Sequence, residues 1–205
     1  MLVLYIGTIL LVEVADLMLN DYIFTYDNIL SEHDHSRLLE LCNNTQFPTG
    51  DQDDRNNEAY YKLTGERGEI LLEQDDEIYY LIHKGMLKTM PKIYTDYSEI
   101  NPPDSPLYDK YSGYWLCKYD VGGHLSIHTD CDADAASITA SFNINDDYEG
   151  GEVCFWGNTD MPKHANSMHV YPSNMLYPHE VKPVTKGVRY SVIVWFGYQK
   201  GNNWE

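Results

Sequence analysis

The first half of the chain carries apolar residues at helical spacing. Ser31 is a good N-cap for a helix over residues 32–43, whose apolar positions are Leu38, Leu39 and Leu41. A second helix is expected over residues 74–100, where the apolar positions are Ile78, Leu81, Ile82, Met86, Met90 and Ile93. Pro91 lies inside this second helix and should break or kink it.

The segments around these helices are of other kinds. Residues 2–14 and 21–26 have the pattern of short strands. Residues 45–68 are polar and rich in Gly, Asp and Asn, so we expect a long surface loop, and a loop of that length in a compact domain is often functional. Residues 101–106 read Asn-Pro-Pro-Asp-Ser-Pro and predict an extended connector.

After residue 108 the pattern changes to short runs of Val, Ile, Phe, Tyr and Trp, separated by Gly, Asn, Asp and Pro. The runs lie near residues 113–119, 124–129, 137–145, 152–156, 168–171, 174–177, 180–184 and 189–198. Short strands at this spacing predict an antiparallel sandwich or barrel. With helices first and strands second, the order predicts an α+β fold, a jelly roll with two helices packed on one sheet. Residues 1–107 are expected to support the core over 108–200 within the same domain.

Composition indicates which partners and which cellular location to expect for this domain. The formal net charge of −18 repels phosphate backbones, so we expect no nucleic-acid partner. The four cysteines form no C-x-x-C pair, which predicts reduced thiols in a cytoplasmic protein. The apolar run at the N-terminus ends before Glu13 and is too short to span a bilayer, so no membrane partner is expected.

Candidate chemistry begins with an H-x-D pair. His128 and Asp130 lie two residues apart on an expected strand, so both side chains point to the same face. One imidazole and one carboxylate can thereby meet at a common point. The pair alone is weak evidence, because polar residues on a surface give the same pattern.

A second polar set strengthens the prediction. His179 follows Asp130 by about fifty residues. Ten residues after His179, Arg189 begins an apolar strand, and Ser191 lies on the same strand face as Arg189. A buried Arg is costly unless an anion meets it, and its planar guanidinium suits a carboxylate. Two His and one carboxylate leave coordination positions open, as in non-haem Fe(II) oxygenases. A structural salt bridge from Arg189 to an Asp or Glu is the alternative.

Together these motifs resemble a known family. The order H-x-D, then Glu-Gly-Gly-Glu at residues 149–152, then H-E-V-x-P-V-x-x-G-x-R-Y-S from His179 is similar to the Fe(II)/2-oxoglutarate dioxygenases, within them the prolyl 4-hydroxylase-like group. The resemblance covers about residues 111–198. It implies a double-stranded β-helix (jelly roll) and hydroxylation of a C–H bond, with release of succinate and CO2. The implied substrate is a prolyl residue in a peptide or protein.

The resemblance also implies roles for single residues. Its iron ligands would be His128, Asp130 and His179, and Arg189 would hold the distal carboxylate of the cosubstrate 2-oxoglutarate. Tyr119 would help to hold the cosubstrate, and Thr139 and Ser191 could add hydroxyl hydrogen bonds. The implied cofactors are Fe(II), 2-oxoglutarate, O2 and ascorbate. This chain departs from the collagen-type enzymes, which usually have Lys at the position of Arg189, and from relatives with a Tyr at the position of Asn143.

Several alternatives stay open at this point. The substrate could be a free amino acid or another small molecule, and the chain could be a metal-binding jelly-roll module without oxygenase activity. His124 shares the face of His128, where it either contacts substrate or is structural. Trp115 and Trp195 are expected in the core, although either could line a pocket. The acidic loop 45–68 could form a lid that favours a basic peptide.

Overall fold

The computed structural model describes residues 19–47, 62–98, 110–131, 137–197 and 201–204. The strand expected over residues 2–14, the connector over 101–106 and most of the loop over 45–68 lie outside the described residues. The predicted division into residues 1–107 and 108–200 stays a prediction. No helix in the described part of the chain is long and apolar enough to cross a membrane.

Both expected helices are present. Helix α2 spans Glu32–Asn44, and the Ser31 side chain caps it by accepting a hydrogen bond from the backbone N–H of Asp34 at 3.2 Å. Helix α4 spans Glu77–Asp96 and continues through Pro91, so the predicted break is wrong. Pro91 lies on the exposed side of α4, while the opposite side is anchored by its apolar residues. Burial of that face outweighs the one hydrogen bond that proline cannot make.

The largest of the three β-sheets in the described residues forms the main layer of the fold. Over the described residues it has eight antiparallel strands. Its main order runs β1 (Phe24–Asp27), β10 (Ser167–Pro172), β6 (Ile138–Asn143), β13 (Arg189–Phe196), β4 (Trp115–Tyr119) and β2 (Arg67–Leu71). The short strands β3 (Lys110–Tyr111) and β14 (Asn202–Asn203) extend it beside the end of β13.

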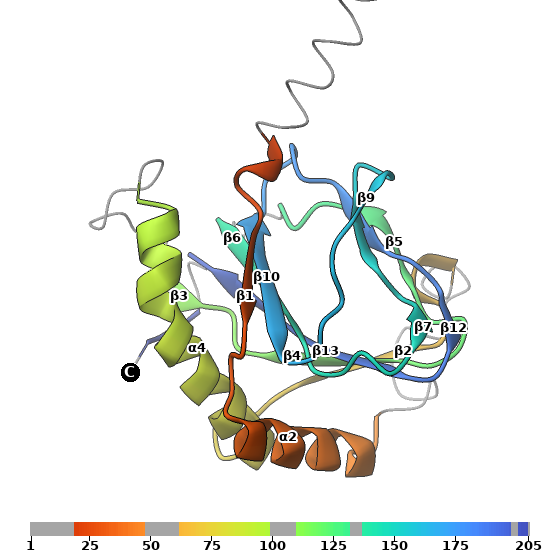
Figure 1. The fold of residues 1–205 in the computed structure, drawn as a ribbon, viewed down its shortest axis with the longest axis horizontal. Coiled ribbons are helices and arrows are strands. Elements are labelled where there is room, and N and C mark those ends of the chain that lie inside the picture. The colour runs from red at the N-terminus through yellow and green to blue at the C-terminus, as the bar shows by residue number, and fades with distance from the viewer. Residues whose placement is uncertain (1–18, 48–61, 99–109, 132–136, 198–200, 205) are drawn as a thin grey trace, which may run out of the picture.

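A smaller sheet completes the architecture. Its strand order is β5 (Leu125–His128), β11 (His179–Val181), β8 (Val153–Phe155) and β9 (Thr159–Asp160). A separate pair joins β7 (Glu149–Gly150) to β12 (Val184–Lys186). Both helices lie on the side of the large sheet away from β5 and β9 (Figure 1). The predicted α+β class, a double-stranded β-helix core with two supporting N-terminal helices, is confirmed.

Alternation along the strands separates two cores. On β13, Tyr190, Val192, Val194 and Phe196 pack with the helices in one cluster. Ile193 belongs to the opposite side, where side chains of both sheets meet. The inner face between the sheets also receives Arg189, which is therefore buried among strands. This inner face is where the candidate site lies.

Three strand predictions need correction. Residues 174–177 form a turn, closed by a hydrogen bond from the Tyr177 N–H to the Asn174 carbonyl, and are not a strand. The run over 180–184 divides between β11 and β12, which belong to different sheets. Strand β2 was not predicted, because it begins at the end of a polar segment and is held mainly by pairing with β4. Within residues 149–152, Glu149–Gly150 form strand β7, and φ is positive at Gly150 (73°) and Gly151 (69°).

Candidate metal and cosubstrate site

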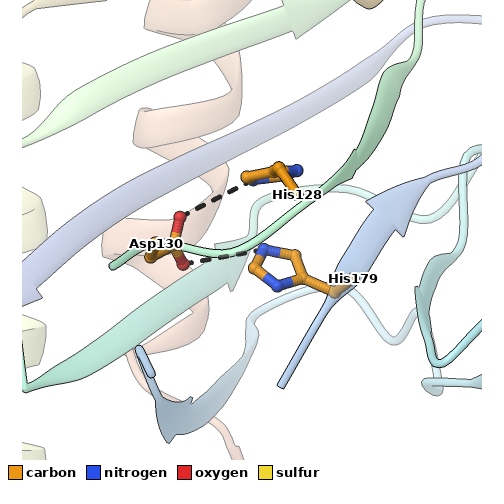
Figure 2. Close-up of side chains that lie close together, drawn as sticks. All are labelled: His128, Asp130 and His179. Atoms are coloured by element: carbon orange, nitrogen blue, oxygen red, sulfur yellow. Dashed lines mark ion pairs between the residues drawn. The ribbon is translucent and has the colours of Figure 1, made fainter. Parts of the chain in front are cut away.

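The three predicted ligand residues converge. His128 ends β5 and His179 begins β11, and they are directly paired across the small sheet. Asp130 lies two residues beyond β5, with Oδ1 3.6 Å from His128 Nε2 and Oδ2 3.6 Å from His179 Nε2. One ligand atom from each residue lies within 4.8 Å of the others. Figure 2 shows the three side chains pointing toward one another.

Backbone carbonyls fix the orientation of both imidazoles. Nδ1 of His128 lies 2.9 Å from the Ser126 carbonyl, and Nδ1 of His179 lies 3.1 Å from the Tyr177 carbonyl. A carbonyl only accepts, so each Nδ1 carries the proton when the ring is neutral. Each Nε2 is then unprotonated and lies 3.6 Å from an Asp130 oxygen. This is the tautomer that a metal site needs.

Burial and mutual contacts set the charges of the cluster. Burial lowers the pKa of His179, which favours the neutral, ligating ring. Burial alone would raise the pKa of Asp130, but its hydrogen bonds to His128 and Thr139 and the nearby His179 outweigh it and keep the pKa below the usual value. Burial would lower the pKa of His128, but the contact with Asp130 and the Ser126 carbonyl raise it overall. Protons therefore compete with a metal chiefly at His128.

Hydroxyl groups hold the Asp130 carboxylate. Thr139 Oγ1 donates to Asp130 Oδ2 at 2.7 Å, and Ser173 Oγ lies 2.8 Å from the same Thr139 oxygen. Since a carboxylate only accepts, the chain runs from Ser173 to Thr139 to Asp130. The Tyr171 hydroxyl lies 3.4 Å from Oδ2 and 3.1 Å from His179 Nε2. The structure thus places Thr139 against a ligand residue, and its predicted contact with cosubstrate stays a prediction.

Arg189 lies at the far end of the inner face and is only 1% exposed. Its Nη1 donates to Ser191 Oγ at 2.9 Å, and Nη2 donates to Asn143 Oδ1 at 3.4 Å. Its Nε is buried without a hydrogen-bond partner, and among the described residues no carboxylate forms an ion pair with it. The predicted Ser191 therefore orients Arg189, and the salt-bridge alternative has no support in this part of the chain.

Tyr119 lies between two guanidinium groups. Arg67, Tyr119 and Arg189 are direct partners on β2, β4 and β13. The Arg189 carbon Cζ is 4.8 Å from the Tyr119 ring centre and that of Arg67 is 5.5 Å away. Arg67 Nε donates to the Tyr119 hydroxyl at 3.1 Å, which leaves the phenol proton available to another acceptor. Burial raises the pKa of Tyr119, so it stays a neutral phenol.

A cavity of about 460 Å³, including space open to solvent, extends from the three ligand residues to Tyr119, and Arg189 is not among its lining residues. It is lined by all three ligand residues and by Arg67, Glu69, Trp115, Tyr119, Leu125, Ser141, Val153, Tyr171, Val181, Ile193 and Trp195. Trp115 and Trp195, expected in the core, therefore line the cavity. His124 is not among the lining residues, and its two ring nitrogens lie near the carbonyls of Gly122 and Lys62, which fits the structural alternative.

Arg67, Tyr171 and Ser141 were not singled out from the sequence. Arg67 lies at the end of a polar segment that has the composition of a loop, so the local sequence does not predict a strand there. Tyr171 and Ser141 do have a signal, because each shares its strand face with another polar residue of the site. That signal becomes specific only when strand pairing places β6 beside β10.

The residues present fit a metal and an anionic cosubstrate. Two neutral Nε2 atoms and one carboxylate form the donor set typical of non-haem iron. The unpaired Arg189 Nε could donate a hydrogen bond to a carboxylate, which would also neutralise the buried cation. The metal end is formed by β5, β11 and the segment after β5, and the cationic end by β13 of the large sheet.

The family comparison agrees with this geometry. Residues 114–197 match the sequence model of the 2OG-Fe(II) oxygenase superfamily, and the matched segment contains both histidines, Asp130 and Arg189. Over this segment the chain is similar to that superfamily. The predicted resemblance is confirmed, and the superfamily's name itself specifies 2-oxoglutarate and Fe(II).

Curated relatives are similar over part of the chain. A PKHD-type hydroxylase of Gloeothece citriformis is 35% identical over 88 residues, 38% of this chain and 39% of that protein. A PKHD-type hydroxylase of Burkholderia ambifaria is 31% identical over 100 residues, 44% of this chain and 41% of that protein. The chain spans about two fifths of the length of these curated relatives.

Solved structures share the fold beyond the oxygenase segment. A Pseudomonas putida prolyl-4-hydroxylase superposes with a TM-score of 0.61 at 17% identity, covering 85% of this chain and 91% of its own. A Trichoplax adhaerens prolyl hydroxylase, solved with a peptide fragment of hypoxia inducible factor, gives 0.65 at 18% identity, covering 86% and 83%. At such identities the likeness concerns the fold.

Proposed function

We propose that this protein is an Fe(II)- and 2-oxoglutarate-dependent dioxygenase that hydroxylates a prolyl residue in a peptide or protein, releasing succinate and CO2. The match of residues 114–197 to the 2OG-Fe(II) oxygenase superfamily supports the reaction class. The prolyl substrate is supported by the resemblance to prolyl hydroxylases, one of which was solved with a peptide. The proposal includes ascorbate as a stimulating reductant and a cytoplasmic location.

The observation that carries the proposal is the unpaired guanidinium of Arg189. A buried cation without a counter-charge is costly, so a protein keeps one where a ligand supplies the charge. Arg189 has only two neutral oxygen partners, and its Nε has none among the described residues. A metal-binding module without a cosubstrate has no use for such a group. This favours the oxygenase over the metal-binding alternative.

The roles of the residues follow from their contacts. His128, Asp130 and His179 would hold the metal, which supplies the oxygen chemistry when bound. Arg189 would bind the distal carboxylate of the cosubstrate, since a planar guanidinium matches a carboxylate. Tyr119 keeps its phenol proton and can donate it to the same molecule. The burial of Arg189 and Tyr119 excludes water and strengthens these contacts.

Anaerobic titration of the purified protein tests the metal and the cosubstrate together. Fe(II) plus 2-oxoglutarate should give a weak visible charge-transfer band, which a structural zinc site would not give. We expect Asp130→Ala to lose the band, because one ligand is gone. Arg189→Gln should retain metal binding but weaken 2-oxoglutarate binding at least about 30-fold, as half of a buried charge pair costs about 2 kcal/mol or more. An unchanged 2-oxoglutarate affinity in Arg189→Gln would overturn the assignment.

The substrate needs a separate test. Proline-containing peptides incubated with Fe(II), 2-oxoglutarate and ascorbate should gain one oxygen, detected by mass spectrometry, and succinate should form in equal amount. Asp130→Ala is the matched control. If wild-type protein turns over 2-oxoglutarate while only free amino acids gain oxygen, the prolyl-peptide proposal fails and the oxygenase assignment stands.

A further inference from the structure

Side chains on the inner face of the large sheet are arranged in rows set by strand pairing. Two rows matter because each touches one end of the site. The metal row holds the paired residues Tyr171, Thr139 and Trp195, and the anion row holds Ser167, Asn143, Ser191 and Cys117. Thr139 contacts Asp130, whereas Asn143 and Ser191 contact the guanidinium of Arg189.

Ser141 lies in the row between these two. It follows Thr139 by two residues on β6 and precedes Asn143 by two, so all three side chains point to the same face. Each step of two residues along a strand is about 6.6 Å. Ser141 therefore stands midway between the residue that touches a metal ligand and the residue that touches the cationic anchor.

The Ser141 hydroxyl has no partner of its own. The residue is 1% exposed, its Oγ is buried without a hydrogen bond, and it lines the cavity together with Asp130 and His179. Its neighbours on β6 differ, because the Thr139 hydroxyl and the Asn143 amide both have partners among the described residues. Leaving a buried polar atom unpaired is unfavourable, so the arrangement calls for a polar ligand.

We propose that Ser141 is a cosubstrate-binding residue whose hydroxyl donates a hydrogen bond to the 2-oxo dicarboxylate that spans the metal row and the anion row. This inference rests on the proposed function and adds to it a contact at the middle of the bound molecule. A short dicarboxylate held at both ends passes over this hydroxyl. The hydroxyl can donate to an oxygen of the ligand while no protein group competes for it.

Binding and stability measurements on Ser141→Ala test the proposal. Calorimetric titration of 2-oxoglutarate into protein loaded with Mn(II), a redox-silent substitute for Fe(II), should give a Kd about tenfold or more above wild type, the loss of one hydrogen bond to a charged group. The melting temperature without 2-oxoglutarate should stay equal or rise, because the substitution removes an unsatisfied polar atom. Ser141→Cys, similar in size with a weaker donor, should also bind more weakly.

Thr89→Val is the control. It also removes a buried hydroxyl, but one in α4 that donates to the Gly85 carbonyl at 2.9 Å and does not line the cavity. This variant should keep its Kd for 2-oxoglutarate.

Two results would overturn the role of Ser141: a Kd in Ser141→Ala within twofold of wild type, or a loss of affinity accompanied by a lower melting temperature. If wild-type protein itself binds no 2-oxoglutarate, the proposed function fails as well, so the two failures are distinguishable.

Discussion

At the residue scale, single hydroxyl groups decide how Asp130 is presented. Asp130 lies beyond the end of β5, so strand pairing does not hold its side chain. Oδ2 receives the Thr139 hydroxyl at 2.7 Å and lies near the Tyr171 hydroxyl. These contacts leave Oδ1, which faces His128, as the oxygen better placed to bind a metal. Replacing a group that orients a metal ligand typically lowers metal affinity or activity about 10–100-fold.

Thr139→Val removes this orienting hydroxyl and keeps the side-chain shape. We expect metal affinity, measured by calorimetric titration with Mn(II), to fall about 10–100-fold. Thr89→Val is the control, since it removes a buried hydroxyl in α4 that bonds only to the Gly85 carbonyl of its own helix. Equal Mn(II) affinities in Thr139→Val and wild type would show that Asp130 is oriented by something else.

At the element scale, the β7–β12 pair depends on a glycine that no other residue can replace. Gly150 has φ of 73°, and a Cβ there would lie 2.2 Å from the Pro183 carbonyl oxygen across the pair. Gly157 has the same φ, but a Cβ there meets nothing within 4 Å. The two glycines therefore separate the cost of backbone conformation from the cost of a clash.

Gly157→Ala should lower the free energy of unfolding by about 1–2 kcal/mol, the conformational cost of a positive φ alone. Gly150→Ala should lower the free energy of unfolding by clearly more, because the Pro183 carbonyl belongs to the backbone and cannot rotate away from the added Cβ. Denaturant unfolding of both variants measures the difference. Equal losses would mean that the β7–β12 pair opens at little cost.

At the scale of the whole molecule, the buried His169 links folding to pH. Its ring is 1% exposed, with Nε2 2.6 Å from the Pro162 carbonyl and Nδ1 3.0 Å from Thr25 Oγ1. The short contact with a carbonyl assigns the proton to Nε2, so Thr25 donates to Nδ1. Burial lowers the pKa of His169 from 6.5 to about 4, with the nearby Arg189 acting in the same direction. The ring is therefore neutral in the folded protein at neutral pH.

Stability should consequently fall on acidification. Between pH 6.5 and about 4 the unfolded chain binds a proton at this position and the folded chain does not. At 1.36 kcal/mol for each pKa unit, His169 alone should lower the free energy of unfolding by about 3 kcal/mol as the pH falls from 6.5 to about 4. Below pH 4 it should cause no further loss. Urea unfolding at several pH values measures the slope. His169→Gln, which keeps polar atoms without titrating, should flatten it; an equally steep slope in that variant would exclude His169 as the cause.

Local sequence patterns predicted both helices, most strands and the candidate metal and anion residues. Ser31 and the apolar spacing of residues 78–93 located the two helices, and short apolar runs located most strands. The pair His128 and Asp130, with Arg189 ten residues after His179, indicated a metal and an anion before any contact was visible. Such signals are local, because a cap, a period or a spacing is complete within a few residues.

Tertiary structure decided what pairing across long separations controls. Strand β2 exists because it pairs with β4, and that pairing brings Arg67 against Tyr119. Pro91 stays within α4 because the opposite side of the helix is buried. Thr139 bonds to Asp130, and Ser141 has no partner, only because β6 lies between β10 and β13. The sequence by itself indicated the candidate ligand residues and Arg189, while strand register decided which side chains touch, since register depends on residues far apart in the chain.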